Sequence, residues 1–413
     1  MTISAQQREA LGEAVGEAGL EEHAPLELEG ARLEATARPR DGAALARLLV
    51  ALARFGLPAL LRGGGSRLWL GNLAPAARVL LETGALAGVD EFDAGEGVCH
   101  AGAGTRLEDL RAKVRAGGWE LPLDPPGRGA TLGGVLAAAA HGPRALGFGK
   151  ARDLVLGLEV VLGSGERTRC GGRVVKNVTG YDLNKLHTGA LGSLGVIEAA
   201  WLRLRPLPER VVLFEARPAR LEGAAALGLA AARRVSARAV ALMAPEPGAS
   251  GAPRLVVELA GDEPSVARDA GWLRDELAAE ETGAEALDEA RALQAAPGLR
   301  FRIGCLASRM EAALAALRQQ GETLLAYPGL GLIYSVTRQA PSDPAATRRH
   351  AKRAAEVARA AGGSVVLEQA PVEARRGLDV FGGAEALLPL HRSLKSRFDP
   401  AGILNPGRFM GHL

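Results

Sequence analysis

The chain has 413 residues, of which 54 are glycine, and its 50 lysine and arginine residues outnumber its 47 acidic residues by three. This length allows two or three domains with cores of their own, and a hydrophobic fraction of 47% excludes an intrinsically disordered chain. The glycine content is about twice the protein average but follows no three-residue period, which excludes collagen, and the dispersed basic residues argue against a nucleic-acid-binding protein.

The cysteines and histidines suggest neither a metal site nor disulfides. Cys99, Cys170 and Cys305 are fewer than an iron–sulfur cluster requires, and the seven histidines lack the spacing of metal ligands. The first twenty residues contain no apolar core of a signal peptide, and no apolar stretch is long enough to cross a bilayer. We therefore expect a cytoplasmic protein, whose membrane association, if any, is peripheral and arises through partners.

The first half of the chain predicts alternating strands, helices and glycine-rich loops. Apolar periodicity predicts a helix at residues 43–55 and strands at 57–61, 78–81 and 98–101. A capping box at residues 105–108 predicts the start of a helix that ends at 117–118. Further on we expect a buried helix at 131–140, a strand at 154–162, a turn at 163–166, a helix at 182–187 and a strand at 195–204.

The second half begins after the Arg-Pro-Leu-Pro sequence at residues 205–208, which is the best candidate for a domain boundary. Strands are predicted at 211–215, 237–243, 254–259, 332–336 and 364–368, and helices at 220–234, 264–281 and 345–361. We interpret Glu280 and Glu281 as part of a solvated helix face. This alternation predicts an antiparallel sheet with helices on one face.

Arg62-Gly63-Gly64-Gly65-Ser66 follows a predicted strand directly. Successive glycines allow neighbouring backbone N–H groups to point into one concavity, and such a nest binds phosphate oxygens. Ser66 can add a hydroxyl donor, and Arg62 or Arg67 can add positive charge. The alternative is a glycine loop that serves only as a turn.

Two further segments suggest close approach of the backbone to a ligand. In residues 122–134, prolines stiffen a loop, Thr131 can cap the next helix, and Gly133 and Gly134 let that helix approach a flat ligand. In residues 189–197 a glycine recurs every third position before a strand, which indicates contact with a ligand or with neighbouring backbone. The Gly102-Ala103-Gly104 sequence lacks the third glycine of a dinucleotide-binding fingerprint.

These three features, in this order, resemble the FAD-binding domain of the vanillyl-alcohol-oxidase (PCMH-type) superfamily over roughly residues 28–207, with a matching ending at 394–409. The resemblance implies an α+β fold, in which a two-part FAD-binding domain carries a cap domain made of an antiparallel sheet and helices. It implies an N-terminal segment at 1–27, the FAD-binding domain at 28–208, the cap at 209–388 and a C-terminal tail at 389–413 that returns to the FAD domain.

Shorter motifs resemble one subgroup, the GlcE subunits of glycolate oxidases. They are the sequences at residues 141–144, 152–153, 156–157, 176–177, 180–182, 398–400 and 405–408. The resemblance implies an FAD-dependent 2-hydroxy-acid (glycolate) oxidoreductase subunit that works with a second flavin subunit, GlcD-like, and an iron–sulfur subunit, GlcF-like. A non-catalytic assembly subunit and a free-standing flavin oxidoreductase of other specificity stay open as alternatives.

The same resemblance assigns the cofactor-binding residues. The glycine loop holds the diphosphate, residues 124–134 run along the diphosphate and isoalloxazine, and residues 189–197 support the adenosine half. The expected FAD-binding residues are Arg62, Gly63, Gly64, Gly65, Ser66, Arg67, Pro122, Asp124, Pro125, Ala130, Thr131, Gly133, Gly134, Gly142, Lys176, Gly192, Val196, Ile197 and Asn405.

The sequence departs from the superfamily pattern in two places. Ser66 stands where many members attach FAD through a histidine, so we expect non-covalent FAD. From the cysteine count and the histidine spacing we expect no metal. The histidine signature of the catalytic relatives is also missing, and the catalytic residues therefore stay unassigned. Arg144 could hold a substrate carboxylate or form a salt bridge, and Tyr181 could lie near the flavin or pack in the core. His141 is expected to pack or to hydrogen-bond locally.

Overall fold

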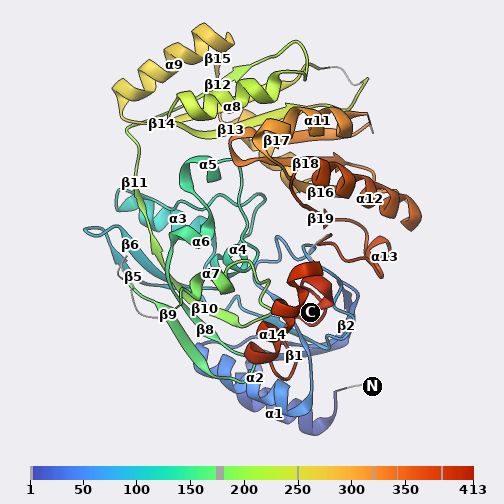
Figure 1. The fold of residues 1–413 in the computed structure, drawn as a ribbon. Helices are drawn as coiled ribbons and strands as arrows, with labels where there is room; N and C mark the ends of the chain where they lie inside the picture. Colours follow the sequence, from blue (N-terminus) through green and yellow to red (C-terminus); the bar gives the residue numbers. More distant parts are fainter. Residues whose placement is uncertain (1–2, 174–180, 249–250, 320, 342, 383–384) are drawn as a thin grey trace.

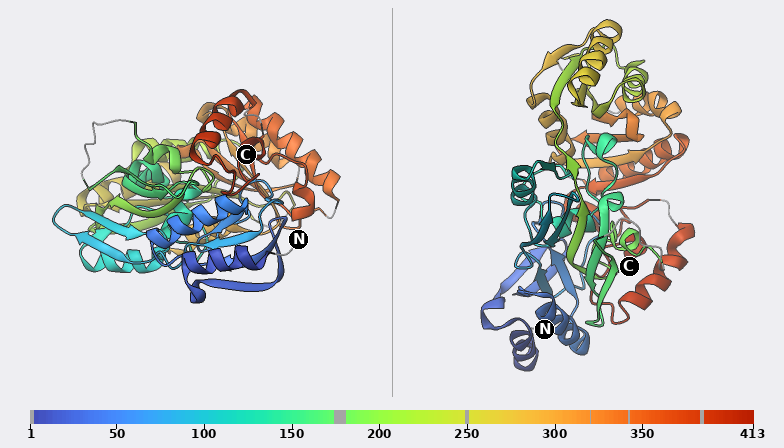
Figure 2. Two further views of the ribbon diagram at one scale, coloured as in Figure 1. Left: turned by 90° about the horizontal axis from the view of Figure 1, so that it is seen from below. Right: turned by 90° about the vertical axis from the view of Figure 1, so that its left-hand side faces the viewer.

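A computed structural model describes residues 3–173, 181–248, 251–319, 321–341, 343–382 and 385–413. Figures 1 and 2 show an elongated molecule with two lobes, in which the second half of the chain forms the lobe at the top. The first half forms the lower lobe, and the C-terminal helix returns to it. The division at 28–208, 209–388 and 389–413 stays a prediction.

The first sheet of the lower lobe has the strand order β1-β2-β4-β3, with β1 antiparallel to β2 and the other pairs parallel. Its strands are β1 (Leu20–Leu28), β2 (Ala31–Ala37), β3 (Ala59–Arg62) and β4 (Val79–Glu82). Helices α1 (Ala5–Val15) and α2 (Gly42–Phe55) pack on it. The segment before residue 28 is therefore partly built into this sheet.

Helix α2 shows how the sequence fixes these elements. The Asp41 side chain caps its first turn by accepting a hydrogen bond from Ala44 N at 2.7 Å. Leucines recur at helical spacing, so Leu45, Leu48 and Leu52 are all fully buried. The helix ends at Gly56, which adopts the left-handed conformation that a glycine reaches without strain.

The second sheet of the lower lobe is antiparallel, with the order β5-β6-β10-β8-β9. Its strands are β5 (Val89–Asp93), β6 (Val98–Gly102), β8 (Val155–Val161), β9 (Arg167–Gly171) and β10 (Val196–Arg203). The associated helices are α3 (Leu107–Ala116), α4 (Leu132–Ala137), α5 (Ala145–Phe148), α6 (Ala151–Leu154) and α7 (Asn184–His187). Short strands β7 (Trp119–Glu120) and β11 (Arg205–Pro206) pair where the chain leaves this lobe.

The upper lobe contains an eight-stranded antiparallel sheet with the order β15-β12-β14-β13-β17-β18-β16-β19. Its strands are β12 (Arg210–Ala216), β13 (Ala237–Ala244), β14 (Arg254–Gly261), β15 (Glu280–Thr282), β16 (Leu299–Gly304), β17 (Thr323–Tyr327), β18 (Leu332–Thr337) and β19 (Val365–Gln369). Its helices are α8 (Ala224–Arg234), α9 (Glu263–Leu277), α10 (Glu285–Ala295), α11 (Met310–Arg318), α12 (Pro344–Ala360) and α13 (Val372–Arg375).

Two sequence expectations for this lobe need correction. Helices α8, α9, α11 and α12 share one core with the sheet, but α10 packs on the opposite face with residues such as Ala239 and Ala241. Helices therefore cover both faces. Glu280 and Glu281 lie in strand β15 rather than in a helix, because α9 ends at Ala278, which has a left-handed conformation (φ 47°).

The C-terminal part returns to the first sheet through α14 (Leu388–Phe398). After this helix, Leu404 forms a parallel bridge with Ala59, and Ala59 N donates to Ile403 O at 2.7 Å. The Lys395 ammonium supports the turn by donating to Asp399 at 2.7 Å and to Leu404 O at 2.7 Å. The expected return of the tail is thus a main-chain contact at β3, next to the glycine loop.

Among the helices that the structure describes, none combines the length and the apolar character needed to span a bilayer. Within the same residues, His, Cys, Asp and Glu side chains form no group of three or more that could bind a metal ion.

Candidate cofactor-binding site

An open cleft lies where β3 and β4 end, between the glycine loop, helix α4, the loop before β10 and the C-terminal tail. Ligands in sheets with parallel strands commonly bind at the carboxyl ends of those strands. Of the expected FAD-binding residues, those that line the cleft are Arg62, Gly63, Gly64, Gly65, Ser66, Arg67, Gly133, Gly134, Gly192, Val196, Ile197 and Asn405. Four segments far apart in the sequence therefore meet at one cleft.

The glycines of the loop allow it to lie directly on the segment before α4. A Cβ atom on Gly63 would clash with the Thr131 hydroxyl, and one on Gly64 would clash with the carbonyl oxygen of Gly129. Gly65 has a positive φ of 74°, which side chains rarely tolerate. At Gly63 and Gly64 the close neighbour is another protein segment. Because these two residues have no side chains, the loop packs directly against that segment and forms a wall of the cleft.

The Thr131 hydroxyl joins the two glycine segments. It caps α4 by accepting a hydrogen bond from Gly134 N at 3.4 Å, as expected, and it also accepts one from Gly64 N at 3.2 Å. Gly133 presses against Ala103, since an added Cβ would lie 2.6 Å from the Cβ of Ala103. Thr131 does not line the cleft itself, but it joins two of the segments that do.

The two arginines of the loop have different partners. The Arg62 guanidinium pairs with Glu82 through Nε at 2.7 Å, and Arg38 also pairs with Glu82 at 2.6 Å. Burial raises the pKa of Glu82, but hydrogen bonds from both arginines outweigh this effect and hold the pKa below its usual value. Arg67 instead reaches the upper lobe, where its Nη1 lies 3.3 Å from Glu368.

Asn405 connects the tail to two walls of the cleft. Its side-chain oxygen accepts from Leu61 N at 2.8 Å, and its side-chain nitrogen donates to Leu191 O at 2.6 Å. The residue has a φ of 46°, a conformation that asparagine tolerates better than most residues. The tail therefore fixes the end of β3 relative to the loop before β10.

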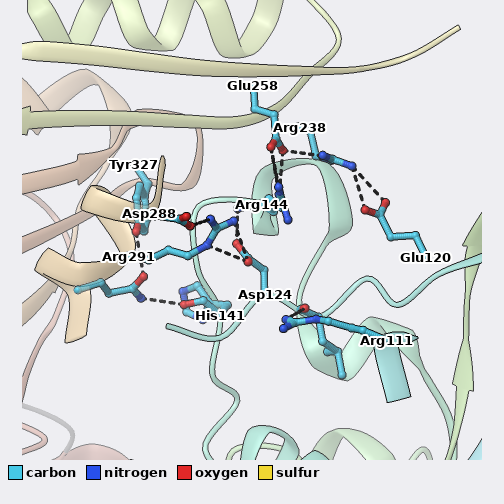
Figure 3. Close-up of polar contacts among 12 residues, drawn as sticks. Arg111, Glu120, Asp124, His141, Arg144, Arg238, Glu258, Asp288, Arg291 and Tyr327 are labelled. Atoms are coloured by element: carbon cyan, nitrogen blue, oxygen red, sulfur yellow. Dashed lines mark hydrogen bonds and ion pairs between the residues drawn. The ribbon is translucent and has the colours of Figure 1, made fainter. Parts of the chain in front are cut away.

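Residues 122–144 contribute to the junction between the lobes as well as to the cleft (Figure 3). The buried Asp124 carboxylate accepts from Arg144 N at 3.0 Å and from Arg291 Nε, on α10, at 3.1 Å. Gly142 is required there, because a side chain would clash with the backbone carbonyl of Asp124. Asp124 thus contacts helix α10 of the upper lobe, and neither Asp124 nor Gly142 lines the cleft.

The Arg144 side chain forms an ion pair across the same junction. Its Nη2 lies 2.7 Å from the carboxylate of Glu258, which is fully buried in β14, and Arg238 donates to that carboxylate at 2.5 Å. Arg238 also donates to Glu120 at 2.9 Å. Of the two roles considered for Arg144, the structure contains the salt bridge.

The remaining expected residues lie outside the cleft-lining set. Pro122, Pro125 and Ala130 are buried in the loop that leads to α4, and Lys176 lies outside the described residues. Tyr181 is 94% exposed, so its ring neither packs in the core nor lines the cleft.

His141 bonds locally, as expected, with Nδ1 3.1 Å from Ala139 O, and burial lowers its pKa. Its carbonyl accepts from the Gln294 side chain at 2.7 Å, and Gln294 bonds to the buried hydroxyls of Tyr327 and Tyr334 at 2.8 Å. These contacts extend the junction across the sheet face covered by α10.

Sequence reasoning missed several lining residues, namely Leu61, Leu68, Leu70, Thr83, Ala137, Ala138, Leu191, Gly195 and Arg408. Leu61 and Thr83 could have been found from their places at the ends of adjacent parallel strands. Arg408 follows Asn405 by three residues, and its guanidinium donates to Leu70 O at 2.6 Å and Asn72 O at 3.0 Å, which shapes the loop after the glycines.

The walls suit an elongated ligand with a charged middle and flat apolar ends. Glycines at 63–65, 133–134 and 192 leave wall segments without side chains, while Leu61, Leu191 and Ile197 supply apolar surface. FAD has this combination of a diphosphate and two ring systems, so the residues present fit the cofactor.

Comparison with known proteins supports the same conclusion. Residues 33–171 match the family model described as FAD binding domain. The chain is 37% identical over 153 residues to the glycolate oxidase subunit GlcE of Escherichia coli, covering 37% of this chain and 43% of that protein. It is 38% identical over 150 residues to a D-lactate dehydrogenase of Archaeoglobus fulgidus, covering 36% and 34%. It is 32% identical over 177 residues to the glycolate oxidase subunit GlcD of Bacillus subtilis, covering 43% and 38%.

Each of these alignments spans less than half of the relative's length. Among solved structures, an alkyldihydroxyacetonephosphate synthase matches with a TM-score of 0.74 at 14% identity, covering 98% of this chain and 86% of that one. The predicted α+β fold, with a PCMH-type FAD-binding domain and a sheet-and-helix cap, is therefore confirmed, and the match to an FAD-binding domain covers residues 33–171.

Proposed function

We propose that the chain is the FAD-binding subunit of a glycolate (2-hydroxy-acid) dehydrogenase complex and that it holds FAD non-covalently. The observation that carries the proposal is the cleft built from the glycine loop, α4, the loop before β10 and Asn405. Ser66 occupies the loop position at which a histidine would be needed for a covalent flavin link, and its hydroxyl is suited to hydrogen bonding instead.

FAD, when bound, supplies the acceptor for the hydride that leaves the α-carbon of a 2-hydroxy acid as its hydroxyl proton is lost. The chain's residues bind and orient the cofactor. The backbone of residues 63–66 and the start of α4 would receive the diphosphate, while Leu61, Leu191 and Ile197 would contact its apolar parts. Asn405 holds two of these walls together.

The proposed complex contains a second, GlcD-like flavin subunit and a GlcF-like iron–sulfur subunit. The similarity to proteins named GlcE and GlcD supports this partnership. Electrons from the substrate would leave through the iron–sulfur partner, and this chain would accept the hydride or relay electrons through its FAD.

A second candidate, a non-catalytic assembly subunit, is favoured by one specific observation. The two catalytic candidates do not provide substrate chemistry, because Arg144 is paired with Glu258 and Tyr181 faces solvent. Binding of FAD and competence for hydride transfer are therefore separate questions.

Two measurements test the proposal. Purified chain should show the visible absorbance of flavin, and acid precipitation should release this flavin into the supernatant; colourless protein that gains no flavin on reconstitution would refute FAD binding, and a yellow pellet would refute non-covalent binding. Glycolate is then added without oxygen to the isolated chain and to the chain with its co-purified partners. Bleaching of the flavin in the isolated chain supports catalysis by this subunit, and bleaching only with partners supports the relay or assembly role.

A further inference from the structure

Among the described residues, three buried N–H donors without a partner belong to residues that meet at the junction of the glycine loop and the upper lobe. They are Nε of Arg67, Nε1 of Trp69 and Nη2 of Arg300, while Nε of Arg300 lies 3.5 Å from Glu368. Buried donors are almost always hydrogen-bonded, so each one without a partner indicates a missing acceptor. The concentration of three at one place points to a common ligand.

The residues that carry these donors form one cluster around Glu368. Arg67 and Arg300 lie 3.3 Å and 3.5 Å from the same oxygen of Glu368, and the Arg300 guanidinium lies 5.6 Å from the ring centre of Trp69. The Arg300 side chain is fully buried and that of Arg67 is 8% exposed. Gln369, the residue after Glu368, carries one unpartnered acceptor. Even if one donor bonded to it, two would remain.

The same cluster holds an excess of positive charge. Arg67, Arg300 and Arg302 all contact Glu368, and within the described residues they form no ion pair with any other acid. Burial raises the pKa of Glu368, but the three arginines outweigh it and set the pKa at about 2, so the carboxylate stays ionised. Three guanidiniums against one carboxylate leave an excess of two positive charges, which is costly in a buried place unless an anion compensates it.

One residue of the cluster reaches the cofactor side, whereas the Arg300 side chain is fully buried. Arg67 lines the cleft, and Arg300 and Arg302 project from β16 with the same orientation because they are two residues apart in a strand. A guanidinium presents a planar fork of donors that matches a carboxylate, and the indole N–H adds a further donor. Arg144, in contrast, already has a complete partner in Glu258.

We propose that Arg67, Trp69 and Arg300 form a binding site for a small carboxylate anion between the glycine loop and the cap sheet. A 2-hydroxy acid is a small carboxylate, so the substrate of the proposed function could occupy this site. The interpretation of the anion as substrate rests on that proposed function. Recognition of the carboxylate is thereby assigned to the cap strand β16 and the glycine loop rather than to Arg144.

Oxalate is the suitable probe, because it carries carboxylates and has no C–H bond from which a hydride could leave. Titration of the FAD-loaded chain with oxalate, followed by calorimetry and by the visible flavin spectrum, should give saturable binding, whereas the uncharged analogue oxamide should give none. The flavin content of each sample is measured separately, so loss of FAD, which would count against the proposed function, is distinguished from loss of the anion site.

Variants identify the residues. Trp69→Phe removes one donor and keeps the ring, so oxalate should bind about tenfold more weakly. Arg300→Lys keeps the charge but loses the fork and should weaken binding at least tenfold. Arg238→Lys alters another buried arginine of the junction, whose partners are Glu258 and Glu120, and should bind oxalate as the unaltered chain does. Absence of saturable oxalate binding to the FAD-loaded chain, unchanged binding in both Trp69→Phe and Arg300→Lys, or equal binding of oxamide would overturn the proposal.

Discussion

The side chain of Asn405 accepts a hydrogen bond from the backbone N–H of Leu61 at 2.8 Å, although 344 positions separate the two residues in the sequence. The contact joins the last segment of the chain to the end of β3, where the glycine loop begins. A second bond from the same amide, to Leu191 O at 2.6 Å, reaches the opposite wall of the cleft. The tail is thus part of the wall of the cleft as well as of the fold.

Asn405→Ala should therefore reduce both stability and FAD retention. The change removes two partly buried hydrogen bonds, each worth about 1 kcal/mol. It also places alanine, which tolerates a positive φ less well than asparagine does, at a φ of 46°. We expect a loss of about 2–3 kcal/mol in the free energy of unfolding and faster FAD release, measured by urea denaturation and by the rise in free-flavin fluorescence.

Asn405→Gly separates the two causes. Glycine adopts a positive φ without strain, so this variant should recover about 1 kcal/mol of the stability lost in Asn405→Ala, while FAD release stays fast because the amide is still missing. Equal stability of the alanine variant and the unaltered chain would show that the tail contact contributes nothing.

Gly64→Ala tests the contact between the glycine loop and the segment before α4. A Cβ atom at this position would clash with the carbonyl oxygen of Gly129, which is backbone and cannot rotate away. The loop must therefore shift, and we expect FAD affinity to fall at least tenfold with a lower melting temperature. Gly84→Ala is the matched control, because nothing lies within 4 Å of its added Cβ and it should bind FAD normally.

The glycine loop also shows how far the sequence could lead. Its place at the cleft was predictable from three successive glycines after a strand, but the reason for Gly63 and Gly64 was not. These two positions are constrained by Thr131 and Gly129, about 65 residues later, and no local pattern reveals such a neighbour. These two glycines allow protein segments to pack closely into a wall of the cleft.

Long periodic elements such as α2 and β8 were predicted from the sequence, whereas short or capped ones were less certain. The expected capping box at Thr105 does not form, because its hydroxyl bonds with Gly88 N at 3.0 Å and Gly88 O at 2.9 Å, and α3 begins at Leu107 without a side-chain cap. The cluster of Arg300 and Glu368 was missed entirely. It depends on the pairing of β16 with β19, which only the folded sheet brings together.

Glu258→Gln should weaken the junction between the lobes. The carboxylate is fully buried between Arg144 and Arg238. Removing its charge leaves Arg144 without its ionic partner and Arg238 with Glu120 alone. Breaking a buried ion pair commonly costs about 3–5 kcal/mol, and because glutamine keeps one acceptor we expect about 2–4 kcal/mol in urea denaturation. Glu263→Gln is the control, since Glu263 pairs with Arg210 while 69% exposed, and its loss should stay below about 1 kcal/mol. Equal effects of the two variants would contradict an ionic junction.

The low pKa of Glu368 predicts a defined pH dependence of stability. The pKa is about 2 in the folded chain and 4.5 in its ordinary state, so the folded form favours the ionised carboxylate. The resulting stabilisation is complete above pH 4.5 and disappears as the pH falls through about 2. The advantage of the unaltered chain is the amount by which its free energy of unfolding exceeds that of Glu368→Gln. This advantage should fall by up to about 3 kcal/mol across the window, since one pKa unit corresponds to about 1.4 kcal/mol.

Urea denaturation of both proteins at several pH values between 7 and 3 measures this difference. The advantage should be constant from pH 7 to about 5 and then shrink with acid, because protonation removes the ionic attraction to Arg67, Arg300 and Arg302. Glu373→Gln is the matched control, because Glu373 pairs with Arg376 at the surface, where solvent screens the pair, and its removal should give a much smaller pH-dependent gap. An advantage that stays constant down to pH 3, or that grows with acid, would mean that Glu368 is not held ionised by these arginines.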